Sequence, residues 1–356
     1  MNLDQRQWAG LACLAITAVG WALNFTLMKL LILEWPPLFS RGMAGLVGAA
    51  TLALIALRLG DSLVLPRRLI GRTLADGFTN VFAWMGFSTL ALLWLPVGQI
   101  LLLVYTMPIW ATLLAWPVHG TRPTGRNVFS IALGIVGVSL LFGGQEGGLE
   151  WTQLLGCALS LGAAILFALG TVLNRAPTEM SLVARTTWQV GLGCLPLAIL
   201  GLLFERPHFS ALSPFGFGIL VYMAIVAMAL CYLTWFSALR GLSASTASAG
   251  LLSVPVLGVL FAALVLGEPL GLREIVAMIL TLSGVAIALH SPLQRRQRER
   301  LHDYLAISLG QRQSPNLSTS PLRVLSMAVM RLPAGLFIQT CRLTPPRCSS
   351  YARRST

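Results

Sequence analysis

Residues 91–123 read ALLWLPVGQILLLVYTMPIWATLLAWPVHGTRP, and residues 238–270 read ALRGLSASTASAGLLSVPVLGVLFAALVLGEPL. The two stretches align without a gap at an offset of 147, and the alignment continues to residues 138 and 285. Matches of Ala and Leu arise by chance in apolar sequence, but aligned Pro and Gly residues are harder to dismiss. The chain therefore contains an internal repeat. The matched pairs include Leu95 with Leu242, Pro108 with Pro255, Gly120 with Gly267, and Gly137 with Gly284.

Both copies of the repeat lie in long apolar segments. A bilayer core of roughly 30 Å needs about 20 apolar residues in a helix, and only helices or closed barrels satisfy their backbone polar groups in lipid. Runs such as 100–104 lack the period-two alternation of barrel strands. We therefore predict an all-α polytopic membrane protein with ten spans, near residues 8–30, 38–57, 73–94, 97–118, 126–142, 151–173, 181–204, 214–239, 243–266 and 272–290.

The offset of the repeat assigns five spans to each copy. We place the first copy at residues 8–142 and the second at 151–290, with a Gly-rich loop between them. Because five is an odd number of crossings, the second copy is inverted in the membrane. Inverted repeats are a construction principle of secondary transporters, with the substrate site near the midplane between the halves. The pattern predicts two inverted five-helix repeats and alternating access.

Composition excludes several other classes of protein. Hydrophobic residues make up 56% and charged residues 10% of the chain, whereas soluble domains carry about a quarter charged residues. Most of the net charge of +13 lies after residue 290, so no nucleic-acid partner is expected. The six Cys form no CxxC pair and the four His are scattered. We expect no metal site, no disulfide framework and no cofactor.

Basic residues are more numerous on one side of the predicted spans. With a cytoplasmic N-terminus, ten of the Lys and Arg residues before the tail lie on the cytoplasmic side and four on the outer side. Cytoplasmic loops of membrane proteins carry such an excess. An even number of spans then returns the C-terminus to the cytoplasm. We predict a multi-pass protein of the cytoplasmic (inner) membrane, with both termini cytoplasmic and the loop at Gly148 outside.

Two stretches carry a family resemblance. The first is residues 20–25 (GWALNF), followed by Lys29, Pro37 and Arg41, and the second is residues 238–270. Their order and the ten-span count resemble the EamA-like members of the drug/metabolite transporter superfamily, over about residues 8–290. The resemblance implies a carrier of small metabolites, often an exporter of amino acids or related compounds. It does not fix the substrate.

The sequence departs from the family pattern at one place in the repeat. The second copy has Glu268 after Gly267, whereas the first has Thr121 after Gly120. The family often has a Glu in both copies, so a symmetric role for this carboxylate is in doubt. Pro108 and Pro255 remove helix hydrogen bonds at equivalent positions and are either hinges or tolerated kinks.

A polar stripe marks the third span. Asp76, Asn80, Trp84 and Ser88 are four residues apart and share one helix face. Such a stripe on a membrane helix faces a cavity or another helix, and we expect Asn80 and Trp84 to line a substrate cavity. Asp76 lies near the cytoplasmic end, where it is either a solvated residue or a proton-coupling acid.

The first two spans carry further candidates. Trp21 and Asn24 are three residues apart, and Asn24 needs a partner at membrane depth. That partner is either a substrate or another helix, because interhelical hydrogen bonds are common in membranes. Lys29 and Arg41 lie near the outer surface and either snorkel or, as the resemblance implies, attract an anionic group.

Aromatic side chains at mid-span depth complete the candidate set. Trp and Tyr populate interfacial belts, but a belt is a poor account of residues this far inside. Packing remains the alternative to a place in the cavity. The candidates on the fourth, seventh and eighth spans are Trp110, Trp188, Tyr232 and Trp235.

The last part of the chain differs from the repeats. Residues 291–356 are rich in Arg, Ser and Pro, and we predict a basic, disordered cytoplasmic tail that transport does not need. The expected partners are a small-molecule substrate and the lipid bilayer, and a homodimer is left open. A secondary transporter is the leading interpretation. A membrane-embedded enzyme such as an acyltransferase and a non-transporting membrane scaffold are the alternatives, although common catalytic motifs are absent.

Overall fold

A computed structural model describes residues 3–120, 122–142, 150–173 and 180–289. All regular elements in these ranges are helical, which confirms the predicted all-α class. Among them, nine helices are long and apolar enough to cross a membrane. The remaining predicted span, 73–94, is the third in chain order. It is built from three shorter segments and carries the polar residues Asp76 and Asn80. The predicted tail and the Gly-rich loop lie outside the described ranges.

Five of the ten spans are single α-helices and five are compound. The single helices are α1 (Leu3–Leu31), α2 (Pro37–Arg58), α7 (Gly125–Phe142), α8 (Trp151–Leu173) and α14 (Leu272–Leu289). The compound spans of the first repeat are α3 (Ile70–Gly77), η2 (Phe78–Ala83) and α4 (Trp84–Ala91), then α5 (Val97–Val104) and α6 (Met107–His119). Those of the second are α9 (Leu182–Leu200) and η3 (Gly201–Glu205), then α10 (Pro214–Val221), η5 (Tyr222–Leu230) and α11 (Cys231–Gly241), then α12 (Ala244–Leu251), α13 (Ser253–Phe261) and η6 (Ala262–Leu266). Two short 3₁₀ turns, η1 (Arg67–Leu69) and η4 (Phe209–Ala211), lie in connections.

The fourth and ninth spans break at equivalent residues. In the fourth span, the Thr106 hydroxyl donates to the Leu103 carbonyl at 2.6 Å, and in the ninth the Ser253 hydroxyl donates to the Gly250 carbonyl at 2.6 Å. Pro108 and Pro255 follow each break within the first turn of the next helix, where a missing N–H costs no helix bond. The aligned prolines of the repeat therefore mark a shared helix break.

The ends of these two spans are also equivalent. Gly120 and Gly267 have φ angles of 68° and 69°, in the left-handed region that glycine adopts without steric cost. A residue with a side chain would be strained at either position. This conformational requirement explains why glycine occurs at both aligned positions of the repeat.

Two π-helical segments occupy matching places in the third and eighth spans. η2 covers Phe78–Ala83 and η5 covers Tyr222–Leu230. A π segment rotates the residues that follow it and disturbs the regular hydrogen-bond ladder, and it occurs frequently at functional sites. The expectation that residues four apart in the third span share one face assumes a regular α-helix. It therefore does not hold through η2.

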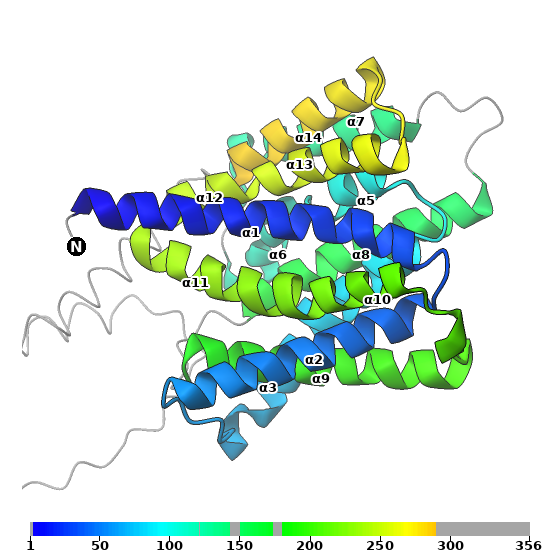
Figure 1. The fold of residues 1–356 in the computed structure, drawn as a ribbon. Coiled ribbons are helices and arrows are strands. Elements are labelled where there is room, and N and C mark those ends of the chain that lie inside the picture. Colours follow the sequence, from blue (N-terminus) through cyan, green and yellow to red (C-terminus); the bar gives the residue numbers. More distant parts are fainter. Residues whose placement is uncertain (1–2, 121, 143–149, 174–179, 290–356) are drawn as a thin grey trace, which may run out of the picture. The chain divides into compact units, whose positions relative to one another are not determined.

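Close helix pairs hold the bundle together. α2 packs along α9, α7 along α14, and α1 along α11 (Figure 1). Small residues allow these approaches: a Cβ on Gly42 would lie 2.3 Å from the backbone nitrogen of Ala198. In the α7–α14 pair, the Ser130 hydroxyl donates to the Gly284 carbonyl at 2.7 Å. Without apolar burial as a driving force in lipid, such contacts determine which helices pair.

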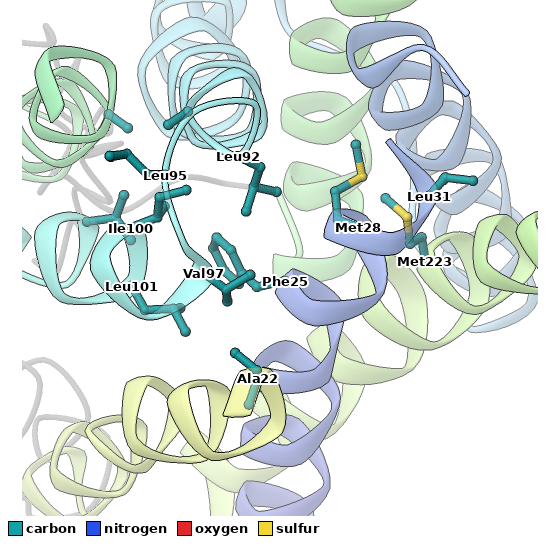
Figure 2. Packing of buried hydrophobic residues seen from close by; sticks show 14 of the residues in the cluster. Ala22, Phe25, Met28, Leu31, Leu92, Leu95, Val97, Ile100, Leu101 and Met223 are labelled. Carbon is teal, nitrogen blue, oxygen red and sulfur yellow. The ribbon is translucent and has the colours of Figure 1, made fainter. Parts of the chain in front are cut away.

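A dense apolar cluster fills one end of the bundle. We call the end where α1 begins the N end and the opposite end the far end. The cluster joins the second half of α1 to the turn between α4 and α5, and Figure 2 shows Phe25 beside Val97 in it. Met28, Leu31, Leu95 and other members are almost completely buried. The far end is therefore closed by packed side chains.

Three carboxylates tie helix ends together. At the far end, Glu205 accepts from the backbone N–H groups of Leu38 and Phe39 at 3.0 and 2.9 Å, at the start of α2. Glu268 accepts from Val97 and Gly98 at 2.7 and 3.1 Å, at the start of α5. These contacts satisfy donors at helix N-termini, where negative charge is favoured.

At the N end, the Ser181 hydroxyl donates to Asp61 at 2.5 Å, which links α2 to α9. These three carboxylates follow the second, seventh and ninth spans. The residue at the matching place after the fourth span is Thr121, which lies outside the described residues.

Candidate functional site

A cavity of about 530 Å³ lies between helices of both repeats. This volume falls in the range of small-molecule sites, roughly 300–1,000 Å³. Its walls combine aromatic and apolar side chains with a few polar groups, a composition typical of ligand sites. The lining residues are Trp21, Asn24, Phe25, Arg41, Asn80, Trp84, Met85, Tyr105, Met107, Phe167, Thr171, Leu182, Arg185, Thr186, Gln189, Met228, Tyr232, Trp235, Phe236 and Leu251.

The contact of α1 with the eighth span orients Trp21. A Cβ on Gly20 would lie 2.4 Å from the Cys231 sulfur, so the glycine brings the two helices together. The Tyr222 hydroxyl donates to the Gly20 carbonyl at 2.9 Å. Trp21 then faces the cavity, and its indole N–H donates to the Ala227 carbonyl of η5 at 3.0 Å.

Aromatic rings form two walls of the cavity. On one wall, the Trp21 ring lies 5.5 Å from Tyr232 in a T-shaped arrangement. On the other, the Trp84 ring lies 4.8 Å from Phe167 and 6.3 Å from Tyr105. These separations are those of favourable aromatic pairs. The pairing holds the rings in place and leaves their remaining faces for an apolar group in the cavity.

Two buried polar side chains of the lining each have one atom without a hydrogen-bond partner among the described residues. Asn24 is 4% exposed and Arg41 is 2% exposed. The Arg41 Nε donates to Thr89 Oγ1 at 3.1 Å, but Arg41 Nη1 and Asn24 Oδ1 have no hydrogen-bond partner among the described residues. Buried polar groups normally have such partners. A molecule in the cavity can therefore offer them hydrogen bonds that the protein does not.

A third polar group, around Asp76, is internally paired. Asp76 Oδ2 accepts from Arg185 at 2.9 Å and from Gln189 at 3.1 Å. Arg185 and Gln189 line the cavity, whereas Asp76 is outside the lining. At 1% exposure Asp76 is not the solvated residue that one alternative expected, because the N-terminal half of α9 covers it.

The structure places some of the other sequence candidates in the cavity lining and others outside it. Asn80 and Trp235 line the cavity, but Trp110 and Trp188 do not. The Trp110 indole N–H donates to Thr106 on its own span at 3.1 Å, and that of Trp188 donates to the Leu63 carbonyl at 2.9 Å.

Lys29 and Glu268, two of the charged candidates near the far end, have structural partners. Lys29 donates to the carbonyls of Leu92 and Leu95, where the third span ends. Glu268 receives the N–H groups of α5, as described above. Neither residue lines the cavity.

On α9 the sequence interpretation selected Trp188 rather than the helix face that lines the cavity. Leu182, Arg185, Thr186 and Gln189 line the cavity, and their spacings of three and four place them on one helix face. That face was readable from the sequence, but the prominent Trp188 lies one position off it. Phe25, Met85, Tyr105, Phe167 and Met228 were missed because apolar lining residues resemble packing residues.

In the described ranges, nine helices apolar and long enough to cross a membrane and the compound third span, with a partly polar cavity between the two repeats, define a membrane protein of the secondary-transporter architecture. A model of the EamA-like transporter family matches residues 8–143 and 154–289. The chain belongs to this family, and the two matched regions lie close to the predicted repeats 8–142 and 151–290.

Individual relatives agree with this assignment. The uncharacterized transporter YvbV of Bacillus subtilis is 26% identical over 278 residues, which cover 77% of this chain and 89% of the relative. A probable amino-acid metabolite efflux pump of Salmonella typhimurium is 27% identical over 285 residues, covering 76% and 92%. A solved crystal structure with 21% identity covers 83% of this chain and 99% of its own, with a TM-score of 0.54, and supports the fold.

Proposed function

We propose that this chain is a secondary transporter that exports small, amino-acid-like metabolites across the cytoplasmic membrane by alternating access. The observation that carries the proposal is the cavity of about 530 Å³ between the repeats, with unpartnered polar groups in its lining. Polar groups at membrane depth are costly and commonly mark substrate pathways. The efflux pump named among the relatives supports the substrate class.

The closed far end supports alternating access. The cavity lining reaches Thr171 in the last turn of α8 and Leu182 in the first turn of α9, both at the N end. The far end is filled by the apolar cluster and joined by Glu205 and Glu268. In the second state of the proposed cycle, these far-end contacts separate while the N end closes.

The charge distribution supports the direction of transport. Ten basic residues before the tail against four favour a cytoplasmic N end. The described state then opens toward the cytoplasm, where an exporter takes up its substrate.

Counterflow in proteoliposomes tests the proposal. Vesicles containing the purified full chain are loaded with an unlabelled amino acid mixture and then given labelled amino acids outside. We expect saturable accumulation of label, which only a carrier produces. Trp84→Ala, in the cavity wall, is expected to reduce the rate, whereas Trp116→Ala, at an exposed position of α6, is the matched control.

The result that would contradict the proposal is no saturable exchange of any tested compound by correctly inserted protein. That result would favour a membrane-embedded enzyme or a scaffold.

A further inference from the structure

We propose that Arg41 binds the carboxylate of the transported molecule, so that the cavity accepts small carboxylates with an apolar body and rejects amines of the same shape. This inference rests on the proposed function, because it assumes that the occupant of the cavity is the transported molecule. It goes further by naming the chemical group that the protein recognises and the residue that recognises it.

The surroundings of Arg41 carry the inference. Its side chain lines the cavity, the residue is 2% exposed, and Nη1 has no hydrogen-bond partner among the described residues. No described carboxylate forms an ion pair with it. A guanidinium is always charged in proteins, and burying a charge is costly unless it is paired. A carboxylate from the occupant is the partner whose geometry best matches a guanidinium.

The charges around the cavity make it selective. Of the described residues, the lining includes Arg41 and Arg185 and no acidic residue. Arg185 is neutralised by Asp76 at 2.9 Å, so the charge of Arg41 is the uncompensated one. A carboxylate neutralises it, whereas an amine without a carboxylate adds a second positive charge beside a buried guanidinium. The cavity should therefore discriminate by charge.

The structure also separates the two cations that the sequence placed together near the outer surface. Lys29 donates to the carbonyls of Leu92 and Leu95 and is outside the cavity lining. Arg41 is a lining residue, and its buried Nη1 has no hydrogen-bond partner among the described residues. Of these two cations, Arg41 is therefore the one that we expect to bind the substrate carboxylate.

Asn24 and the aromatic walls extend the recognition. Asn24 Oδ1 is an unpartnered acceptor in the same lining, and a substrate ammonium is a suitable donor once a carboxylate has neutralised Arg41. Trp84 and Phe167 offer an apolar surface to the body of the molecule. A zwitterion with an apolar side chain contacts Arg41, Asn24 and the aromatic wall. A carboxylate without an amine contacts Arg41 and the aromatic wall but offers no ammonium to Asn24.

Four compounds of one shape test the inference on the purified full chain in detergent. They are leucine, 4-methylpentanoate, which lacks the amine, leucinamide, whose carboxylate is an amide, and 3-methylbutylamine, which lacks the carboxylate. None of them fluoresces, so binding is measured through the tryptophans of the cavity walls. We expect the two carboxylates to bind at least about tenfold more tightly than the other two, equivalent to 1.4 kcal/mol.

Three variants locate the effect. Arg41→Gln is expected to remove the preference for carboxylates, and Arg41→Lys to keep part of it, since the charge remains but the two-pronged geometry is lost. Arg126→Gln, an exposed arginine at the start of α7, removes the same charge outside the cavity and should keep the full preference. The wild-type comparison of the four compounds stands even if Arg41→Gln fails to fold.

The outcomes distinguish this inference from the proposed function. Equal binding of all four compounds, no binding of either carboxylate at millimolar concentration, or an undiminished preference in Arg41→Gln would overturn the carboxylate site. Saturable counterflow that treats leucine and leucinamide alike would overturn it too, while the transport proposal stands. Carboxylate-selective binding without any counterflow would support the site and overturn transport.

Discussion

Asp76 and Arg185 form a pair between α3 and α9 at 2.9 Å, with the carboxylate side chain 2% and the arginine side chain 24% exposed. Removing one partner of a buried pair leaves the other charge uncompensated, which is more damaging than removing both. Because solvent reaches Arg185, we expect Asp76→Asn to destabilise the protein by about 2 kcal/mol, less than for a fully buried pair. Thermal unfolding in detergent measures this.

The double variant Asp76→Asn with Arg185→Gln provides the control. Its loss of stability should be smaller than the sum of the two single losses, because neither charge is left alone. Simple addition of the two losses would show that the pair is not coupled.

The sequence indicated which spans carry polar residues better than it indicated which residues those polar side chains contact. The stripe through Asp76, Asn80 and Trp84 predicted one shared face, and Asn80 and Trp84 line the cavity whereas Asp76 does not. The sequence could not show that Arg185 pairs with Asp76, because this contact joins residues 109 apart in the chain. It depends on how α3 and α9 meet, which is a tertiary property.

The contact of α2 with α9 depends on glycine. A Cβ on Gly42 would lie 2.3 Å from the backbone of Ala198, and a backbone cannot move aside as a flexible side chain can. We expect Gly42→Ala to separate the helices and to lower the yield of folded protein, measured by size-exclusion chromatography. Gly218→Ala in α10 is the matched control, since nothing lies within 4 Å of its Cβ position. Equal yields for both variants would contradict the packing account.

The contact of Glu268 with α5 gives a second prediction for helix ends. Its two oxygens accept from Val97 and Gly98, and losing an N-terminal cap typically costs about 1 kcal/mol. We expect Glu268→Ala to lower the melting temperature. Glu274→Ala removes a partly exposed carboxylate that accepts from the Gly271 N–H within its own turn at 2.9 Å and links no second helix among the described residues, and it should have a smaller effect. The reverse order of the two effects would refute this role of Glu268.

Hydropathy predicted where the spans lie but not how they are interrupted. The predicted spans 97–118 and 243–266 are each broken two or three residues before a proline, and the proline pair of the repeat pointed to these places. The π segments η2 and η5 had no such signal, because an apolar run reads the same in α and π helices. Such segments change which side chains face inward, so the rotation of a span is less predictable than its position.

The distribution of basic residues predicts the orientation of the spans in the membrane. With the N-terminus cytoplasmic, the loop between the repeats lies outside, because five spans precede it. We expect a reporter fused after Gly148 to show activity characteristic of the outer side, and one fused after Arg68 to show the cytoplasmic side. A cytoplasmic signal after Gly148 would contradict both the orientation and the inversion of the repeats.

The inverted repeat made the architecture predictable, whereas the cavity was only partly so. An odd number of spans per copy fixes the relation of the halves, and the pairs Pro108 with Pro255 and Gly120 with Gly267 identified the copies. The cavity depends on which face of each helix turns inward. Trp188 and Gln189 are neighbours in the chain, yet only Gln189 lines it.

Access to the cavity from both sides of the membrane tests the central claim most directly. Asn80, in η2, lines the cavity and lies in the middle of the third span. In a chain whose six cysteines are replaced by alanine, Asn80→Cys offers a single thiol to a reagent that cannot cross the membrane. We expect labelling when the reagent is supplied from either side alone, and slower labelling when a transported compound occupies the cavity. Labelling from one side only, whether or not substrate is cycling, would contradict alternating access.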